Sequence, residues 1–328
     1  MGWHFCRNAL AVAVIAFSLN FAGSGVSQGA NVPESDKVIK IAVAESASQV
    51  FQSQIIGRIL TEAGYNTELI TAGYYPQIQG LADGDLHVAT SLWSSNMGEG
   101  WMKLFESGQV HDAGGTGYVG VETWYANDKA LEMCPGIDAD WTLLKGCAKV
   151  FASAETFPKG RLLDYPIEWG TLNEPRIVAL DLPFVSQPAG SEGAMIAEIK
   201  SAEERGEPLL IMFWSPHGIH ANYRLTPIAL PEYWDGCTDD PSGGINPNAT
   251  FDCDWDQARV WKATWPGMSE VWPAALRIVE SIEHADKDLV RMMNAIDVDG
   301  IELDAYIDQW MIDNRSRWQG WIDEASAE

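Results

Sequence analysis

The feature that most constrains the fold is a run of alternating strand-like and helix-like segments near the start of the chain. Residues 37–43 are rich in β-branched side chains, and residues 46–64 place apolar side chains at helical spacing before Gly64. From these patterns we expect strand, helix, strand, short helix and strand at 37–43, 46–64, 66–71, 75–82 and 85–92. This order is typical of a parallel sheet covered by helices.

The middle of the chain repeats this pattern, which predicts a second α/β unit. Residues 192–205 have the spacing of an amphipathic helix, and residues 208–214 form a strongly apolar strand. Further strands are expected at 118–126, 177–182, 224–230 and 259–264, and further helices at 137–148, 272–285, 287–295 and 302–325. Two such units indicate two lobes with a cleft, where ligands bind at the carboxyl ends of strands.

The start of the chain has the composition of a secretory signal peptide. A short basic segment, Met1–Arg7, precedes the apolar segment Ala9–Ala22, which is too short to span a bilayer. Small residues between Gly23 and Ala30 offer cleavage sites, so we expect residues 1–29 to be removed. No later run is apolar enough to cross a membrane, and we expect a soluble, periplasmic mature protein.

Removal of the signal peptide leaves four cysteines, and an even number in an exported chain favours disulfides. The pairs closest in sequence are Cys134–Cys147 and Cys237–Cys253, but three connectivities are possible. A zinc site is the alternative, and no CxxC or matching histidine spacing favours it. We therefore expect neither a metal nor a cofactor.

The formal net charge of −25 limits the classes of partner. Such acidity disfavours nucleic acids and anionic membranes, because both are themselves negatively charged. It fits a solvated surface in a saline medium, or a cationic or zwitterionic ligand.

Three tryptophans stand where a ligand is expected. Trp93 and Trp214 end apolar segments that we expect to be strands, and Trp169 lies beside a glycine-containing turn. Aromatic faces attract quaternary ammonium groups, so these three side chains predict a cage for a methylated cation. Core packing is the alternative for each of them, because the chain has 15 tryptophans.

Six short segments, taken in order, extend this hypothesis: Leu60–Tyr65, Gly84–Trp93, Asn96–Met97, Glu168–Gly170, Phe213–Pro216 and Trp318–Ala325. With them, the chain from about Lys37 to Ala325 resembles the substrate-binding proteins of ABC importers for glycine betaine and related osmolytes, the OpuAC-type, ProX-like family. The resemblance implies a binding protein and not an enzyme, a monomer that serves membrane permease and ATPase subunits.

The resemblance also implies an α/β fold of the two-lobed type II periplasmic-binding-protein class. Each lobe holds a mostly parallel sheet flanked by helices, and the chain crosses between lobes at two hinges. We expect lobe I to comprise residues 37–121 and 258–328, and lobe II residues 122–257. Closure of the hinge would trap the ligand between them.

In this family, aromatic residues at positions like those of Trp93, Trp169 and Trp214 box the methylated cation. Backbone amides after the middle tryptophan hold its carboxylate, which points to Gly170 and Thr171 in this chain. Position suggests two more ligand-binding candidates. Trp124 is a candidate for an extra wall, and burial under the sheet is the alternative. Glu45 ends the first strand, and it either contacts the ligand or complements the dipole of the following helix.

Glycine betaine is the expected ligand from the resemblance. Trimethylamine N-oxide, choline, carnitine, proline betaine and dimethylsulfoniopropionate share its methylated onium group. Choline-type relatives carry an aromatic residue in the first strand–helix loop, whereas this chain has Ala44–Ala47 there. This difference makes choline a weaker expectation, and an N-oxide or sulfonium ligand remains open.

Two other classes of function are compatible with parts of the sequence. Tryptophan platforms and a carboxylate pair are typical of secreted carbohydrate-active hydrolases, but no such pair stands out among 46 acidic residues. The chain also lacks a G-x-S-x-G elbow and an HExxH motif. A binding protein that reports its ligand to a receptor has the same sequence features as one that serves a permease.

Overall fold

The computed structural model of the chain describes residues 1–2, 32–170 and 173–327. The expected signal peptide lies almost entirely outside the described residues, as does Thr171. The strands are β1 (Ile39–Val43), β2 (Thr67–Thr71), β3 (Val88–Trp93), β4 (His111–Asn127), β5 (Gly160–Asp164), β6 (Phe184–Pro188), β7 (Leu210–Ser215), β8 (Leu225–Pro227) and β9 (Ala258–Thr264). The α-helices are α1 (Ala47–Glu62), α2 (Tyr74–Asp83), α3 (Glu99–Glu106), α4 (Asp128–Met133), α5 (Leu144–Cys147), α6 (Asn173–Ala179), α7 (Glu192–Arg205), α8 (Met268–Val271), α9 (Pro273–Ser281), α10 (Asp286–Met293), α11 (Leu303–Asp313) and α12 (Arg315–Ala327).

The strands follow the order β2-β1-β3-β9-β4-β7-β5-β6, and β8 pairs with β4. Strands β1, β2 and β3 are mutually parallel, as are β5, β6 and β7, which agrees with the predicted β-α-β units. Strands β9 and β4 join these two groups by antiparallel pairing. This is the mostly parallel, two-lobed arrangement that the sequence predicts.

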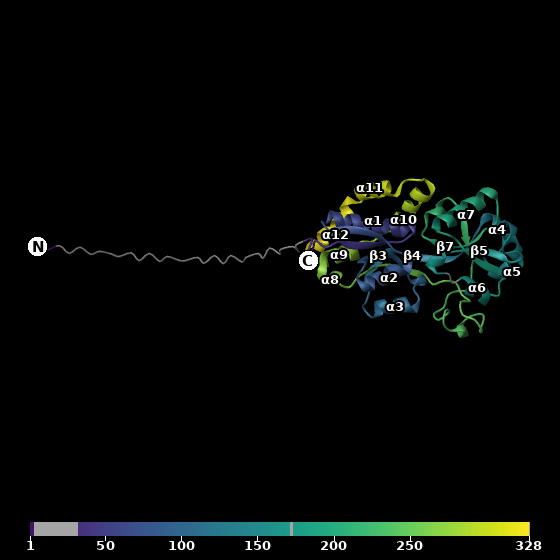
Figure 1. The fold of residues 1–328 in the computed structure, drawn as a ribbon. Coiled ribbons are helices and arrows are strands. Elements are labelled where there is room, and N and C mark those ends of the chain that lie inside the picture. Colours follow the sequence, from purple (N-terminus) through teal and green to yellow (C-terminus); the bar gives the residue numbers. More distant parts are fainter. Residues whose placement is uncertain (3–31, 171–172, 328) are drawn as a thin grey trace.

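The long strand β4 belongs to both lobes. Its first part, His111–Gly120, pairs with β9, and its second part, Val121–Ala126, pairs with β7. We define lobe I by β1, β2, β3, β9 and the first part of β4, and lobe II by the second part and β5–β8. The two lobes lie side by side in Figure 1, with β4 running from one into the other.

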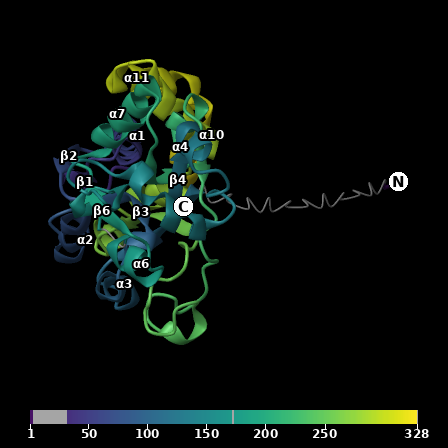
Figure 2. The same ribbon diagram turned by 90° about the vertical axis from the view of Figure 1, so that its right-hand side faces the viewer.

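Helices cover both faces of the sheet in lobe I. Side chains alternate across a strand, so Ile41 of β1 packs in the core beneath α1, whereas Ala42 packs in the core beneath α2. Helices α1, α10 and α11 lie on one side of the sheet and α2 and α3 on the other, which both views show (Figures 1 and 2). Lobe II has its own core, formed by β4–β7 and the helices around them.

One predicted strand is a helix. Residues 177–182 were expected to be a strand, but α6 occupies Asn173–Ala179 and the strand, β6, begins at Phe184. In α6, Ile177 is buried while its neighbour Val178 is 66% exposed. A short apolar run of this kind does not distinguish a buried strand from a helix, so packing against lobe II decides. The expected helix 302–325 is also two helices, α11 and α12, with Asn314 between them.

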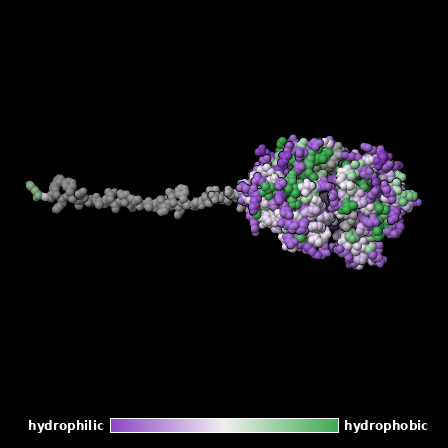
Figure 3. Space-filling model, in the orientation of Figure 1, coloured by the Kyte–Doolittle hydropathy of each residue, from purple (hydrophilic) through white to green (hydrophobic). Residues whose placement is uncertain are grey.

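The cysteines form the two pairs closest in sequence, Cys134–Cys147 and Cys237–Cys253. The second pair closes the loop between β8 and β9, which extends below the lobes in Figures 1 and 2. On the face shown in Figure 3, hydrophilic residues cover most of the surface. Among the described helices, none combines the length and the apolar character that a membrane span requires.

Candidate ligand-binding site

A cavity of about 480 Å³, including the solvent space at its mouth, lies between the two lobes. Lobe I contributes Ala44, Ser46, Ser48, Gln49, Tyr74, Ser91, Trp93 and Asn96, and lobe II contributes Glu122, Tyr165, Trp169 and Trp214. The structure therefore brings Trp93, Trp169 and Trp214, which the sequence places far apart, to one cavity.

A local irregularity of β3 aims Trp93 at the cavity. The pairing of β3 with β9 shifts register between Ala89 and Leu92, and Ser91 within this shift has a positive φ of 55°. A bulge of this kind re-aims the side chains around it. The Trp93 indole N–H donates to Ser91 Oγ at 3.3 Å. The ring of Trp93 lies against Gly120, where a Cβ atom would come within 1.9 Å of it.

Three aromatic rings of lobe II pack edge to face on the opposite side. The centroids of Tyr165, Trp169 and Trp214 are each 5.6 Å from the other two, with interplanar angles of 61–72°. Behind them, Phe213 stacks on Trp214 at 4.3 Å. Edge-to-face packing fixes the orientation of each ring, so this half of the site is rigid and presents π-surface to the cavity.

Glu122 places a carboxyl group in this aromatic cavity. It lies on β4 directly across from Trp214 in the β4–β7 pairing, and it is only 4% exposed. Burial raises the pKa of Glu122 above its usual value, and the neighbouring Ser95 and Tyr165 hydroxyls counteract only part of that rise. Within the described part of the chain, Oε2 of Glu122 has no partner in hydrogen-bonding geometry.

The electrostatic character of the cavity follows from these side chains. Of the described residues that line it, none is a lysine or an arginine. A protonated Glu122 is a hydrogen-bond donor, and an ionised Glu122 would attract a cation. The site thus combines aromatic faces, one buried acid and several hydroxyl groups, which suits a small methylated cation that also carries an acceptor atom.

A polar layer supports the floor of the cavity in lobe I. Ser91 Oγ lies 3.3 Å from the Tyr118 hydroxyl and 3.5 Å from Ser48 Oγ, and Gln52 donates to the same Tyr118 hydroxyl at 3.1 Å. These bonds satisfy buried polar groups and fix the hydroxyls that face the ligand.

Two of the ligand-binding candidates take other positions. Trp124 is fully buried in the core of lobe II, where its indole N–H donates to Asn173 Oδ1 at 2.5 Å. Trp124 therefore lies outside the lining of the cavity, and Asn173 of α6 holds its ring in the core. Glu45 is exposed and does not line the cavity; its carboxyl group meets that of Glu168 from the other lobe and raises the pKa of Glu168.

Of the two backbone amides predicted to hold a ligand carboxylate, the structure describes that of Gly170. The Gly170 N–H already donates to the carbonyl of Ile167 at 3.1 Å, so it is engaged within its own turn. Thr171, the other predicted amide, lies outside the described residues.

Sequence reasoning missed Glu122, Tyr165 and Tyr74, which all line the cavity. One signal for Glu122 was present: it is an acid within a run of apolar and aromatic residues, Tyr118–Ala126. A charge in such a strand needs either a partner or a function. The tyrosines carry no comparable signal, because a buried tyrosine is common in any core.

A second cavity of about 1640 Å³ adjoins the first, between α3 and the loop that ends at Asp256. One aromatic face in it is already taken: the Arg176 guanidinium lies 3.4 Å from the ring centroid of Trp255. Arg176 also donates from Nε to the carbonyl of Cys253 at 2.5 Å. This arginine therefore stabilises the loop and does not line the first cavity.

Comparison with known proteins places the chain among transport proteins. Residues 37–313 match the family model described as the substrate binding domain of the ABC-type glycine betaine transport system. The chain is 28% identical over 321 residues to the trimethylamine N-oxide-binding protein of Pelagibacter ubique (strain HTCC1062), an alignment that covers 95% of this chain and 96% of that protein.

Solved structures agree on the fold. An ABC-transporter choline binding protein in complex with choline superposes with a TM-score of 0.68 at 18% identity, covering 90% of this chain and 95% of that chain. The glycine betaine/L-proline-binding protein ProX from Borrelia burgdorferi gives 0.69 at 15% identity, covering 89% and 98%. Lactococcal OpuAC, closed around glycine betaine, gives 0.65 at 16% identity, covering 88% and 100%. The predicted type II periplasmic-binding-protein fold is thereby confirmed.

Proposed function

Because the chain belongs to the family of substrate-binding domains of ABC-type glycine betaine transport systems, we propose that it captures trimethylamine N-oxide for import. Members of this family bind transported solutes and are not enzymes. The family and the relatives support a substrate-binding protein of an ABC transporter, for ligands of the betaine, choline and N-oxide type. The choice of one ligand is the proposal.

The observation that carries this choice is the buried carboxyl group of Glu122, whose Oε2 has no hydrogen-bond partner among the described residues. Trimethylamine N-oxide presents three methyl groups on a cationic nitrogen and one oxygen that accepts hydrogen bonds. Because burial raises the pKa of Glu122, this residue can keep its proton and donate it to that oxygen. The full-length similarity to a trimethylamine N-oxide-binding protein supports the same ligand.

The methyl groups would be held by Trp93, Trp169 and Trp214. A trimethylated nitrogen has no N–H to donate, so aromatic faces that desolvate it are its best host. Each face contributes about 0.5–2 kcal/mol, and three faces with burial are sufficient for micromolar binding, about −8 kcal/mol. An unmethylated ammonium would lose its hydration in this cavity without gaining equivalent hydrogen bonds.

Glycine betaine is the second candidate, and the N-terminal end of helix α1 favours it. Ser46, Ser48 and Gln49 from this end line the cavity. The Ala47 and Gln49 N–H groups at this end already have acceptors, so the Ser46 and Ser48 hydroxyl groups would be the donors to a betaine carboxylate, and the helix dipole would favour its negative charge. The family description also names glycine betaine.

We propose that the chain is exported by residues 1–29, works in the periplasm as a monomer and delivers its ligand to permease and ATPase subunits. We also retain the division into lobe I, residues 37–121 and 258–328, and lobe II, residues 122–257. The change of partner within β4 after Gly120 supports the first of these boundaries.

Calorimetric titration of the mature protein tests the ligand. Trimethylamine N-oxide, glycine betaine, choline, carnitine and dimethylsulfoniopropionate are titrated separately into the wild-type protein and the variants Trp93→Ala, Trp214→Ala and Trp321→Ala. Trp321 lies on α12 in lobe I, away from the cavity, and serves as the control. We expect the tightest binding for trimethylamine N-oxide, with loss in the first two variants only. Tighter binding of glycine betaine would transfer the function to that ligand, and no binding of any compound would refute the cage.

A further inference from the structure

We propose that Glu192 is one of the residues that hold the two lobes together over the ligand. It is the first residue of α7 in lobe II and is buried. Its Oε2 accepts a hydrogen bond of 2.9 Å from the backbone N–H of Ala47, the first residue of α1 in lobe I. The proposal deepens the binding function given above and rests on it where ligand release is concerned.

The contact suits both groups chemically. Backbone N–H groups in the first turn of a helix have no partner within the helix, and the helix dipole places partial positive charge there. The acceptor is a carboxyl oxygen in a buried setting, where a hydrogen bond to a charged group is stronger than one between neutral groups. Helix α1 spans 16 residues, so its dipole is fully developed.

A histidine fixes the carboxyl group in this position. His217 is buried, and its Nδ1 accepts from the Ile219 N–H at 3.0 Å, so its proton sits on Nε2. Nε2 lies 3.1 Å from Oε1 of Glu192 and donates to it. Each oxygen of Glu192 therefore faces a donor: one from lobe I and one from lobe II.

This arrangement adjoins the cage. The His217 ring meets Trp214 edge-on, with centroids 5.0 Å apart and an interplanar angle of 90°. Ser46 and Ser48, which flank Ala47, line the cavity on the other side. A ligand that settles Trp214 and the start of α1 in their places thus also brings Glu192 and Ala47 within bonding distance.

A second contact between the lobes, next to Glu192, is tightly packed. The turn η5 (Gly218–Ala221) of lobe II lies against η7 (Asn294–Val298) of lobe I. A Cβ atom at Gly218 would come within 2.4 Å of the backbone nitrogen of Asn294. Asn222 also donates to Asn294 Oδ1 at 2.6 Å. Closure of the two lobes therefore brings this turn and Glu192 into contact with lobe I at the same time.

The geometry makes Glu192→Gln the sharpest test. A glutamine has nearly the same shape, but one of its two terminal groups is a donor. That group would face either the Ala47 N–H or the His217 Nε2–H, because His217 cannot change tautomer without losing its bond to Ile219. One of the two bonds must break.

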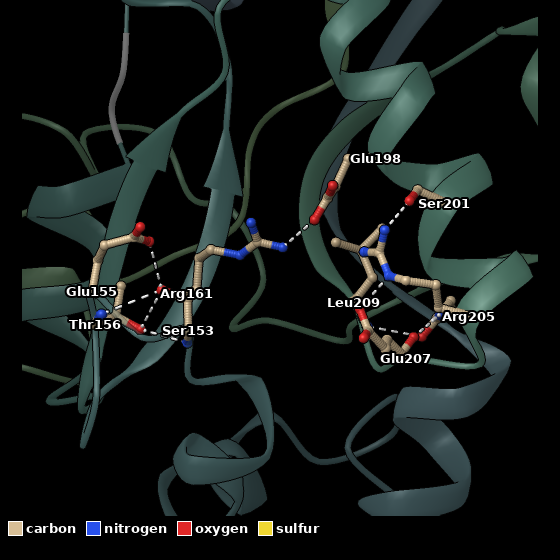
Figure 4. A network of polar contacts seen from close by, with 10 residues as sticks. Ser153, Glu155, Thr156, Arg161, Glu198, Ser201, Arg205, Glu207 and Leu209 are labelled. Atoms are coloured by element: carbon tan, nitrogen blue, oxygen red, sulfur yellow. Dashed lines mark hydrogen bonds and ion pairs between the residues drawn. The ribbon is translucent and has the colours of Figure 1, made fainter.

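The chain offers a matched control on the same helix. Glu198 of α7 pairs with Arg161 of β5 at 2.5 Å, entirely within lobe II (Figure 4). Glu198→Gln removes the same charge from the same helix without touching lobe I. Any effect common to both variants therefore reports on α7 itself and not on the joining of the lobes.

Three measurements are made on the wild-type protein, Glu192→Gln and Glu198→Gln. Stopped-flow tryptophan fluorescence gives the dissociation rate of trimethylamine N-oxide. Small-angle X-ray scattering gives the radius of gyration with and without it, and hydrogen exchange gives the protection of the Ala47 amide. We expect Glu192→Gln alone to release the ligand about ten- to a hundred-fold faster. It should also remain more expanded in the presence of ligand, with a less protected amide.

Equal dissociation rates and equal radii in all three proteins would overturn the proposal. If the wild-type protein fails to bind trimethylamine N-oxide, the proposed ligand is wrong, and the same three measurements are made with glycine betaine, the second candidate. Faster dissociation, a larger radius and faster exchange at Ala47 in Glu192→Gln than in the other two proteins then support the proposal. Identical values in all three proteins with glycine betaine bound overturn it.

Discussion

The hydroxyl group of Tyr74 binds the backbone of Trp93 at both of its polar groups. It accepts a hydrogen bond from the Trp93 N–H at 2.8 Å and lies 3.3 Å from the Trp93 carbonyl, to which it donates. Burial raises the pKa of Tyr74 far above its usual range, so the hydroxyl keeps the proton that it donates. One side chain of α2 thus fixes the end of β3 at the cavity.

We expect Tyr74→Phe to weaken ligand binding about fivefold. The variant removes both hydrogen bonds to Trp93, each worth about 1 kcal/mol, and lets the end of β3 move. Calorimetric titration of trimethylamine N-oxide measures the change. Tyr306→Phe, on α11 and outside the cavity, should leave affinity unchanged. An unaltered dissociation constant in Tyr74→Phe would show that Trp93 is held by its other contacts.

Gly120→Ala should reduce affinity about tenfold or more. A methyl group at this position would lie 1.9 Å from the Trp93 ring, a distance that no structure tolerates, so the ring must leave its place. Gly115→Ala is the control on the same strand, since its nearest neighbours would be 3.9 Å away. Titration and the tryptophan emission spectrum check the outcome. Equal affinity in the two variants would remove Trp93 from the cage.

The role of Glu122 predicts a defined dependence on pH. If Glu122 donates its proton to the ligand, affinity falls as pH rises through its raised pKa, because the ionised form cannot donate. Glu122→Gln keeps a donor and should bind with an affinity that does not change with pH. Titrations between about pH 5 and 9 make the comparison. Weaker binding at low pH would instead assign Glu122 as an anionic partner of the cation.

The same residue predicts an effect on folding stability. The pKa of Glu122 is higher in the folded than in the unfolded chain, so stability is lost as pH rises from the unfolded pKa to the folded one. Glu122→Gln lacks this loss and should be more stable than the wild-type protein at neutral pH. Urea unfolding of both proteins at pH 4 and pH 7.5 measures this difference in stability. We expect it only at pH 7.5, and equal stabilities of the two proteins at that pH would contradict the prediction.

His284 predicts a loss of stability in acid. It is fully buried against Phe51 and Trp310, and burial lowers its pKa to about 3. The unfolded chain binds a proton near pH 6.5 and the folded chain does not, so stability falls as pH decreases below 6.5. Relative to His284→Phe, the wild-type protein should lose about 2 kcal/mol between pH 6.5 and 5.

Urea unfolding at several pH values measures the slope of the free energy of unfolding against pH. The absolute stability of His284→Phe depends on how well the larger ring fits, but the slope does not. Parallel curves for wild-type and His284→Phe would contradict the assignment.

Much of the fold was predictable because its signals are local. Apolar spacing of 3.6 and 2 residues located α1, α7, β1 and β7 to within a few residues, and the β-α-β order predicted the parallel pairings. The failure at α6 has a definite cause, since an apolar run of this length fits either a strand or a helix. Its packing against lobe II, absent from the local sequence, makes it a helix.

The ligand-binding site was only partly predictable, as two residues of β4 illustrate. Glu122 and Trp124 are two apart and share one face of the strand. Glu122 lies at the cavity, whereas Trp124 is about 7 Å further into lobe II, where α6 covers it. Sequence alternation gives the face of a strand but not the point at which a cavity ends.

The sequence by itself determined the order of the elements, the two α/β units and the positions of Trp93 and Trp214 at strand ends, since each depends on residues near one another in the chain. Only the tertiary structure decided that β4 passes Glu122 beneath the aromatic rings, and that Glu192 reaches Ala47 from the other lobe. Those contacts join residues far apart in sequence, and they exist only after the strands have paired and the lobes have met.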